Sequence, residues 1–235
     1  MKKLLSVSVA SLAFASIAAY TPTSVGVTEI TPTSVNTIVP APYQSLADGE
    51  SIAVQDLVKA ANLPDGTMLY FYNGSAFNAW IRGTGENVGK WIGSSITSKD
   101  GITVSPGSST VKLTVGSALW VIISDEPTTR KIYIYGKPSE VTTTTVTAGS
   151  TALVANPRQT SVIPTINNPA NGDVIGFVDG TTYTYNTTKG KWGSRVKSGT
   201  SLPTWQDFTF EALPFGSGFW YTSKGSTNVT INWGE

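Results

Sequence analysis

The feature that most constrains the fold is an internal repeat. Segment 36–45 (NTIVPAPYQS) matches 151–160 (TALVANPRQT), and 64–74 (PDGTMLYFYNG) matches 171–180 (NGDVIGFVDG). Shorter matches follow in the same order: Lys90-Trp91 with Lys191-Trp192, 115–121 (VGSALWV) with 215–221 (FGSGFWY), and 130–136 (RKIYIYG) with 228–234 (NVTINWG). An unchanged order predicts two copies of one structural unit. Gly136-Lys137-Pro138 marks the boundary, which gives units 20–138 and 139–235.

Each unit has the pattern of a β domain. Apolar and polar residues alternate in 68–72, 111–115, 131–135, 181–185 and 228–232, and β-branched and aromatic residues fill these runs. Asn73-Gly74 and Asp179-Gly180 predict type I′ hairpins. Only 52–63, followed by Pro64, has helical spacing. We therefore expect an all-β fold of two tandem repeat domains, each a small sandwich or barrel, with one short helix near 52–63.

The first 19 residues have the pattern of a secretory signal peptide. Lys2 and Lys3 precede a short apolar run, and Ser16 and Ala18 suit cleavage by a signal peptidase. The apolar run is shorter than the roughly 20 residues of a membrane-spanning helix. We expect domains at 20–138 and 139–235 to be exported to the cell surface or extracellular space, with the periplasm as the alternative, and to contain no membrane span.

The composition excludes much common chemistry. The chain has no His and no Cys, so it offers no thiol nucleophile, no Ser-His-Asp triad and no zinc site with nitrogen or sulfur ligands. Sixteen Lys and Arg balance 15 Asp and Glu, which argues against nucleic-acid binding. Most carboxylates adjoin Gly or Pro, where they serve turns. We expect no enzymatic activity, no cofactor and no metal.

Aromatic residues are the remaining candidates for function. Trp91, Trp120, Trp192 and Trp220 recur in both repeats and are expected to build the two cores, whereas Trp80 and Trp205 have no partner in the other repeat. An exposed Trp can stack on a sugar ring or anchor a protein interface, but a loop Trp can also fold over its own domain. The candidate ligand or interface residues are Trp80, Trp205, Tyr183 and Tyr185.

The repeats resemble secreted bacterial β-repeat modules found in Verrucomicrobia, Lentisphaerae and Bacteroidetes, which mostly carry no assigned activity. Their pattern runs from N-x-[IL]-[VI]-x-x-P through [ND]-G-[DT] and an isolated Trp to G-x-G-F-W. The matching positions are 36–42, 65–67, 91 and 115–121 in the first repeat, and 153–157, 172–173, 192 and 216–220 in the second. The first repeat departs from it at Ala118-Leu119. The resemblance implies an exported β protein and transfers no catalytic residue.

Two functions of different classes remain. The first is a structural or interaction protein of the cell surface that self-assembles into a filament or layer. The β-like segment 20–38 would then add to an exposed sheet edge of another copy, although pairing within its own domain is the alternative. The second is a carbohydrate-binding module that uses exposed Trp and Tyr side chains. The expected partners are accordingly another copy of the chain or a cell-surface glycan.

Overall fold

The computed structural model describes the chain as an all-β protein, which confirms the predicted fold class. Within the described residues every regular element is a strand, every strand pairs antiparallel with its neighbours, and there is no helix. Nor do these residues include an apolar helix of membrane-spanning length. The described residues are 26–32, 35–44, 51–53, 63–72, 77–82, 85, 91–96, 102–106, 112–123, 130–197 and 202–234.

The first half of the chain contains a three-stranded and a six-stranded sheet, in the orders β1-β11-β3 and β2-β10-β5-β6-β7-β8, and a separate β4-β9 pair. Its strands are β1 Gly26–Ile30, β2 Asn36–Pro40, β3 Tyr43–Gln44, β4 Ser51–Ala53, β5 Met68–Tyr72, β6 Phe77–Arg82, β7 Trp91–Ile96, β8 Ile102–Pro106, β9 Lys112–Thr114, β10 Ala118–Ile122 and β11 Ile132–Pro138.

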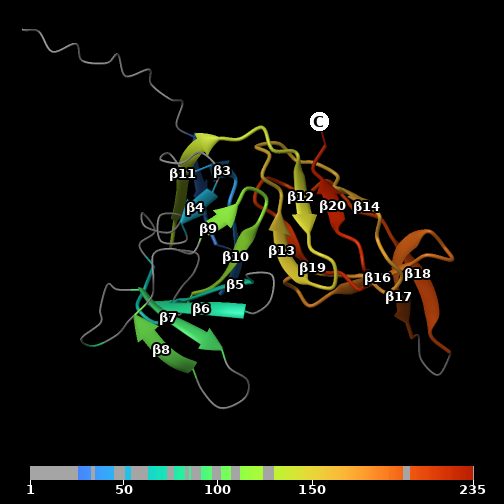
Figure 1. Ribbon diagram of the computed structural model, residues 1–235, viewed down its shortest axis with the longest axis horizontal. Coiled ribbons are helices and arrows are strands. Elements are labelled where there is room, and N and C mark those ends of the chain that lie inside the picture. Colours follow the sequence, from blue (N-terminus) through green and yellow to red (C-terminus); the bar gives the residue numbers. More distant parts are fainter. Residues whose placement is uncertain are drawn as a thin grey trace, which may run out of the picture.

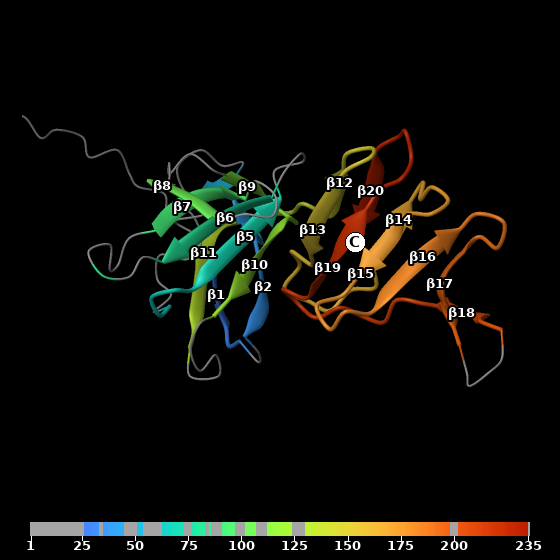
Figure 2. The same ribbon diagram turned by 90° about the horizontal axis from the view of Figure 1, so that it is seen from below.

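The second half has the same two sheets, in the orders β12-β20-β14 and β13-β19-β15-β16-β17-β18. Its strands are β12 Thr143–Val146, β13 Thr151–Ala155, β14 Thr165–Asn167, β15 Val174–Gly176, β16 Thr182–Asn186, β17 Lys191–Val196, β18 Thr204–Phe208, β19 Gly218–Thr222 and β20 Val229–Asn232. When β4 and β9 are left out, corresponding strands counted along the chain occupy corresponding places in the sheets of the two halves. Figures 1 and 2 show the halves side by side.

Each half encloses its own core between its two sheets, so each is a small β-sandwich. In the first half, Leu69 and Leu119 of the larger sheet pack with Ile134 of the smaller one. In the second half, Phe219 of the larger sheet packs with Ile231 of the smaller one. The alternation that predicted the strands therefore places every second side chain between the sheets.

A third apolar cluster joins the halves. Its buried members are Ala118, Leu153 and Ala155, and Trp120 and Trp220 pack against it. The two indoles meet edge to face, with ring centroids 6.2 Å apart. Sequence reasoning placed both Trp residues in the separate cores. They lie instead on the outer face of each larger sheet, because their strand neighbours at 119, 121, 219 and 221 take the inward positions.

Some local predictions are wrong, and others concern residues outside the described part of the chain. Ile52 and Ala53, the expected first residues of a helix, belong to strand β4 and pair with β9. The rest of that segment, 54–62, lies outside the described residues, as do the leader 1–19 and Asn73-Gly74. The β15–β16 hairpin is present, but of its expected central pair only Gly180 has a positive φ, +87°. The predicted type I′ turn is wrong, because such a turn needs a positive φ at both central residues and Asp179 does not have one. Asp179 Oδ1 instead accepts a hydrogen bond from Thr181 N–H at 2.9 Å, which belongs to a different turn.

Candidate functional site

The strongest candidate site lies on the outer face of the larger sheet in the second half, over strands β17 and β18. Trp192 packs against the core, so the alternate β17 positions 191, 193 and 195 lie on the opposite, outer face. The antiparallel register pairs Gly193 with Asp207 and Arg195 with Trp205, which brings these β18 residues to the same face. A one-residue shift in register would move the whole set to the core side.

Trp205 lies across Gly193. A Cβ atom at residue 193 would stand only 2.6 Å from Cε2 and 2.7 Å from Cζ2 of the indole, and closer still to the backbone oxygen of Gln206. Only glycine therefore lets the indole approach the sheet this closely. Trp205 remains partly exposed.

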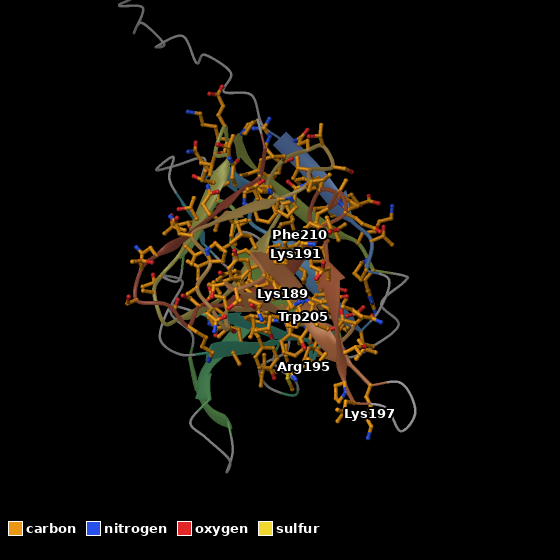
Figure 3. The ribbon with its side chains drawn as sticks, turned by 90° about the vertical axis from the view of Figure 1, so that its right-hand side faces the viewer. Lys189, Lys191, Arg195, Lys197, Trp205 and Phe210 are labelled. Carbon is orange, nitrogen blue, oxygen red and sulfur yellow. The ribbon has the colours of Figure 1, made fainter. Side chains whose placement is uncertain are left out.

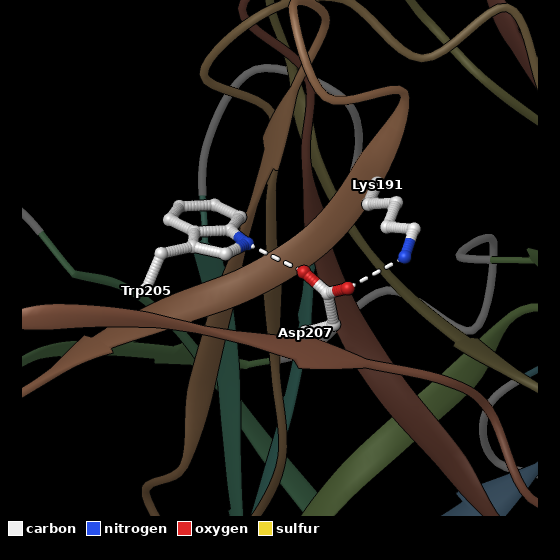
Figure 4. Close-up of polar contacts among 3 residues, drawn as sticks. All are labelled: Lys191, Trp205 and Asp207. Atoms are coloured by element: carbon white, nitrogen blue, oxygen red, sulfur yellow. Dashed lines mark hydrogen bonds and ion pairs between the residues drawn. The ribbon is translucent and has the colours of Figure 1, made fainter.

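Asp207 connects the indole to a cation. Its Oδ1 atom accepts a hydrogen bond from Trp205 Nε1 at 2.9 Å, and its Oδ2 atom accepts one from Lys191 Nζ at 2.6 Å (Figure 4). The hydrogen bond from Lys191 holds the pKa of the Asp207 carboxylate below its ordinary value of 3.8, and the Trp205 bond and the charge of Lys189 act in the same direction. The carboxylate is therefore ionised at neutral pH. We call Lys191, Gly193, Trp205 and Asp207 the Trp205 platform.

Further cations surround the platform. Arg195 lies further along β17, Lys197 directly follows the strand, and Lys189 precedes it; all three side chains are exposed. Figure 3 shows the four labelled cations and Trp205 along one side of the second half. Asp207 is the one carboxylate that forms an ion pair with this group among the described residues.

A groove adjoins the platform at the start of β17. It has a volume of about 350 Å³ and is bounded by Lys191 and Asp207 on one side and by residues 163–166, before and within β14, on the other. Aromatic residues Trp192, Phe208 and Phe210 form part of its lining. Figure 3 labels Phe210 beside Lys191 at this end of the site. Trp192 and Phe208 belong to the inner face of the sheet, so the groove lies beside the platform and not on its outer face.

The structure separates the four aromatic residues that sequence reasoning brought together. Trp80 is only 4% exposed and belongs to the first core, so its indole is covered. Tyr183 stacks on Phe208 with ring centroids 3.9 Å apart, and Tyr185 packs against Trp192 at 5.1 Å. Both tyrosines lie on the inner face of the sheet, half-buried, and support the platform from behind. Of the four, Trp205 alone lies on the outer face described above.

Two larger grooves lie at the junction of the halves, with volumes of about 430 Å³ and 720 Å³. The first is lined mainly by apolar and hydroxyl residues of 30–38 and 213–218, without any charged side chain. The second contains Glu140 and Arg158 but no Trp. Neither groove combines an aromatic platform with a cluster of charges, so we rank both below the β17–β18 site.

The buried carboxylate of Asp173 has a structural role. It accepts hydrogen bonds from the backbone N–H groups of Ala170 and Lys224, at 2.8 Å and 2.6 Å, and from the Tyr221 hydroxyl. Burial, followed by the Asp173 hydrogen bond, raises the pKa of Tyr221. Protein donors thus occupy this carboxylate. Among the described residues no three acidic, His or Cys side chains gather in a way that could hold a metal ion.

Comparisons with known proteins give no further guide, since no family model, no curated protein sequence and no solved structure significantly matches the chain. The site must therefore be interpreted from its own geometry. Sequence reasoning found Trp205 because it had no partner in the other repeat, but missed Lys191, Gly193 and Asp207. The usable signal was the alternation of Lys, Gly and Arg at 191, 193 and 195 in a strand, with Lys197 directly after it.

Proposed function

We propose that this chain is an exported, non-enzymatic interaction protein that binds carbohydrate through the Trp205 platform. The observation that carries the proposal is a partly exposed indole laid over Gly193, with its N–H held by Asp207. A pyranose ring has a flat, largely apolar C–H face and polar hydroxyls around its edge. A fixed indole flanked by polar side chains matches both parts of such a ring.

The fixed geometry also favours binding energetically. An aromatic side chain that is already held in its bound orientation loses little conformational entropy when a ligand arrives. The Lys191 ammonium has donors to offer ring hydroxyls, and the Asp207 carboxylate has acceptor positions beyond the two that Trp205 and Lys191 use. Stacking and hydrogen bonding would therefore act on the same sugar unit.

The tandem organisation and export of the chain belong to the same proposal. Identical strand orders in the two larger sheets and in the two smaller sheets support the division into repeats at 20–138 and 139–235. The leader pattern at 1–19 supports export. An exported protein built of two β-sandwiches would present the platform to glycans outside the cytoplasm.

Self-assembly through the N-terminal strand is the second candidate. β1 is an edge strand with a single neighbour, β11, and a register of five residue pairs from Gly26↔Gly136 to Ile30↔Ile132. An edge strand with one neighbour can be exchanged with another copy, which would produce an open polymer. Deleting 20–33 should abolish filaments if exchange builds them. Unchanged assembly after the deletion would exclude this route.

The test of the main proposal is a glycan-binding screen with the mature chain, followed by calorimetric titration of the glycans that bind. Trp205→Val removes the indole and installs a residue with high β propensity. It should weaken binding at least tenfold. Leu202→Ala is the matched control, because Leu202 is 87% exposed and its loss also removes a large apolar side chain near β18. No binding across neutral and acidic glycans, or equal binding by Trp205→Val, would reject the proposal.

A further inference from the structure

The charges around the Trp205 platform are strongly one-sided. Four of the six basic residues in 139–235 fall within 189–197, a stretch that contains no acidic residue. This concentration occurs in a chain with 16 basic and 15 acidic residues overall, so it cannot be ascribed to a generally basic composition. The four basic side chains, which are close in the sequence, also lie on one side of the second half (Figure 3).

Alternation along β17 places its cations in a line. Lys191 and Arg195 are four residues apart on the outer face, which corresponds to about 13 Å along an extended strand, and Lys197 follows Val196, the last residue of the strand. Trp205 lies between the two ends of this line, over Gly193. A linear ligand that stacks on the indole would thus meet cations on both sides.

In the part of the chain that the structure describes, only one of these cations is neutralised by a carboxylate. Lys191 forms an ion pair with Asp207, whose side chain is 45% exposed. Among the described residues, Lys189, Arg195 and Lys197 form no ion pair, although Lys189 contributes to the low pKa of Asp207. The surface beside the indole therefore keeps a net positive charge at neutral pH, which a ligand with negative groups would complement.

We propose that the platform selects acidic polysaccharides, with uronate carboxylates or sulfate groups, over neutral ones; this inference rests on the proposed function. Trp205 binds the face of one sugar ring, while Arg195 and Lys197 bind acidic groups of neighbouring units. Arg195 can contact a carboxylate or sulfate through two parallel N–H···O bonds. A single-stranded nucleic acid fits less well, because its bases stack on successive aromatic side chains and this surface presents one indole.

The test compares four probes with the mature chain: polygalacturonate, dextran sulfate, neutral dextran and an oligothymidylate. We expect the acidic glycans to bind at least tenfold more tightly than neutral dextran, and raising NaCl from about 0.05 M to 0.5 M to reduce the difference through screening. The double variant Arg195→Gln, Lys197→Gln should weaken binding of the acidic glycans about tenfold and leave neutral binding unchanged.

The matched control is Arg158→Gln, Lys224→Gln, which removes the same charge from the two basic residues of the second half outside 189–197. It should bind acidic glycans like the unaltered chain. Equal affinity for acidic and neutral glycans, together with loss of both in Trp205→Val, would overturn the acidic preference while supporting the proposed function. Absence of glycan binding would overturn both, and tighter binding of the oligothymidylate would replace the glycan by a nucleic acid.

Discussion

Replacing Gly193 by alanine tests the central contact of the platform. The added methyl group would stand 2.6 Å and 2.7 Å from two ring carbons of Trp205, well inside ordinary van der Waals separation. The indole could swing away, but the methyl group would also collide with the backbone oxygen of Gln206, which belongs to the neighbouring strand. Relief therefore requires β17 and β18 to move apart as well.

The expected cost follows from this double collision. Overpacking a closely packed site typically costs about 1–3 kcal/mol, and each kcal/mol lowers the melting temperature of a domain of this size by about 4–8 °C. Gly193→Ala should therefore lower the melting temperature of the second half by roughly 10 °C. Displacement of the indole should also break the Asp207 bond, change the Trp fluorescence and weaken glycan binding.

Gly176→Ala is the control for this experiment. Gly176 lies on the same outer face in β15, and a Cβ atom there would meet Thr182 at 3.7 Å and Trp220 at 3.8 Å, which are ordinary contacts. Alanine there should change stability by about 0.5 kcal/mol or less and leave binding intact. Equal stability of Gly193→Ala and Gly176→Ala in calorimetry, together with an unchanged glycan affinity of Gly193→Ala in titration, would refute this prediction.

Three further predictions concern the buried Asp173, the junction of the halves and the contact between Asp207 and Lys191. Asp173→Ala should lower the free energy of unfolding, measured in urea, by about 2–5 kcal/mol, since it leaves the Tyr221 hydroxyl and two backbone donors without an acceptor. A loss of less than about 1 kcal/mol would contradict this prediction. Trp220→Ala should lower the free energy of unfolding by roughly 1–3 kcal/mol, because the two halves lose a shared contact. It should also raise the radius of gyration measured by X-ray scattering, and an unchanged radius would argue against a junction held by this indole. The depressed pKa of Asp207 means that its contact with Lys191 contributes stability above about pH 3.8 and loses it as pH falls through the lower folded-state pKa. Trp fluorescence should therefore stay constant from pH 8 to 5, and a change near pH 6 would refute the assignment.

The sequence was informative wherever short-range patterning decides the structure. Alternation in 68–72 and 228–232 predicted strands β5 and β20, because one face of each sheet is buried and the side-chain period of a strand is two. The segment that begins at Ile52 shows the limit. The apolar residues of this segment have helical spacing. Its first residues nevertheless form a strand, because they pair with β9, whose Leu113 is remote in sequence.

The site was harder to predict from the sequence because it depends on the register between strands. Trp205 could be nominated from its missing counterpart, but its bond to Asp207 and its contact with Gly193 require β17 and β18 to pair in one particular alignment. For the same reason Tyr183 and Trp205, which both looked like surface aromatics, lie on opposite faces of one sheet. The sequence supplies the alternation, whereas pairing between strands decides which residues share a face.

The two larger sheets differ at the Trp205 platform in a way that supports the proposed ligand-binding role. Strand order and register match Gly193, Trp205 and Asp207 with first-half positions held by Ile92, Val104 and Pro106. Since a sheet of the same order forms with those residues, a six-stranded sheet of this kind does not need a glycine, an indole and a carboxylate at these places. Packing in the core would explain Gly193, Trp205 and Asp207 only if these residues faced inward. They lie instead on the outer face of the sheet. Within the described residues, the second half thus combines a glycine-dependent aromatic contact with three cations that form no ion pair, at places where the first half has other residues, and this supports the proposed binding surface.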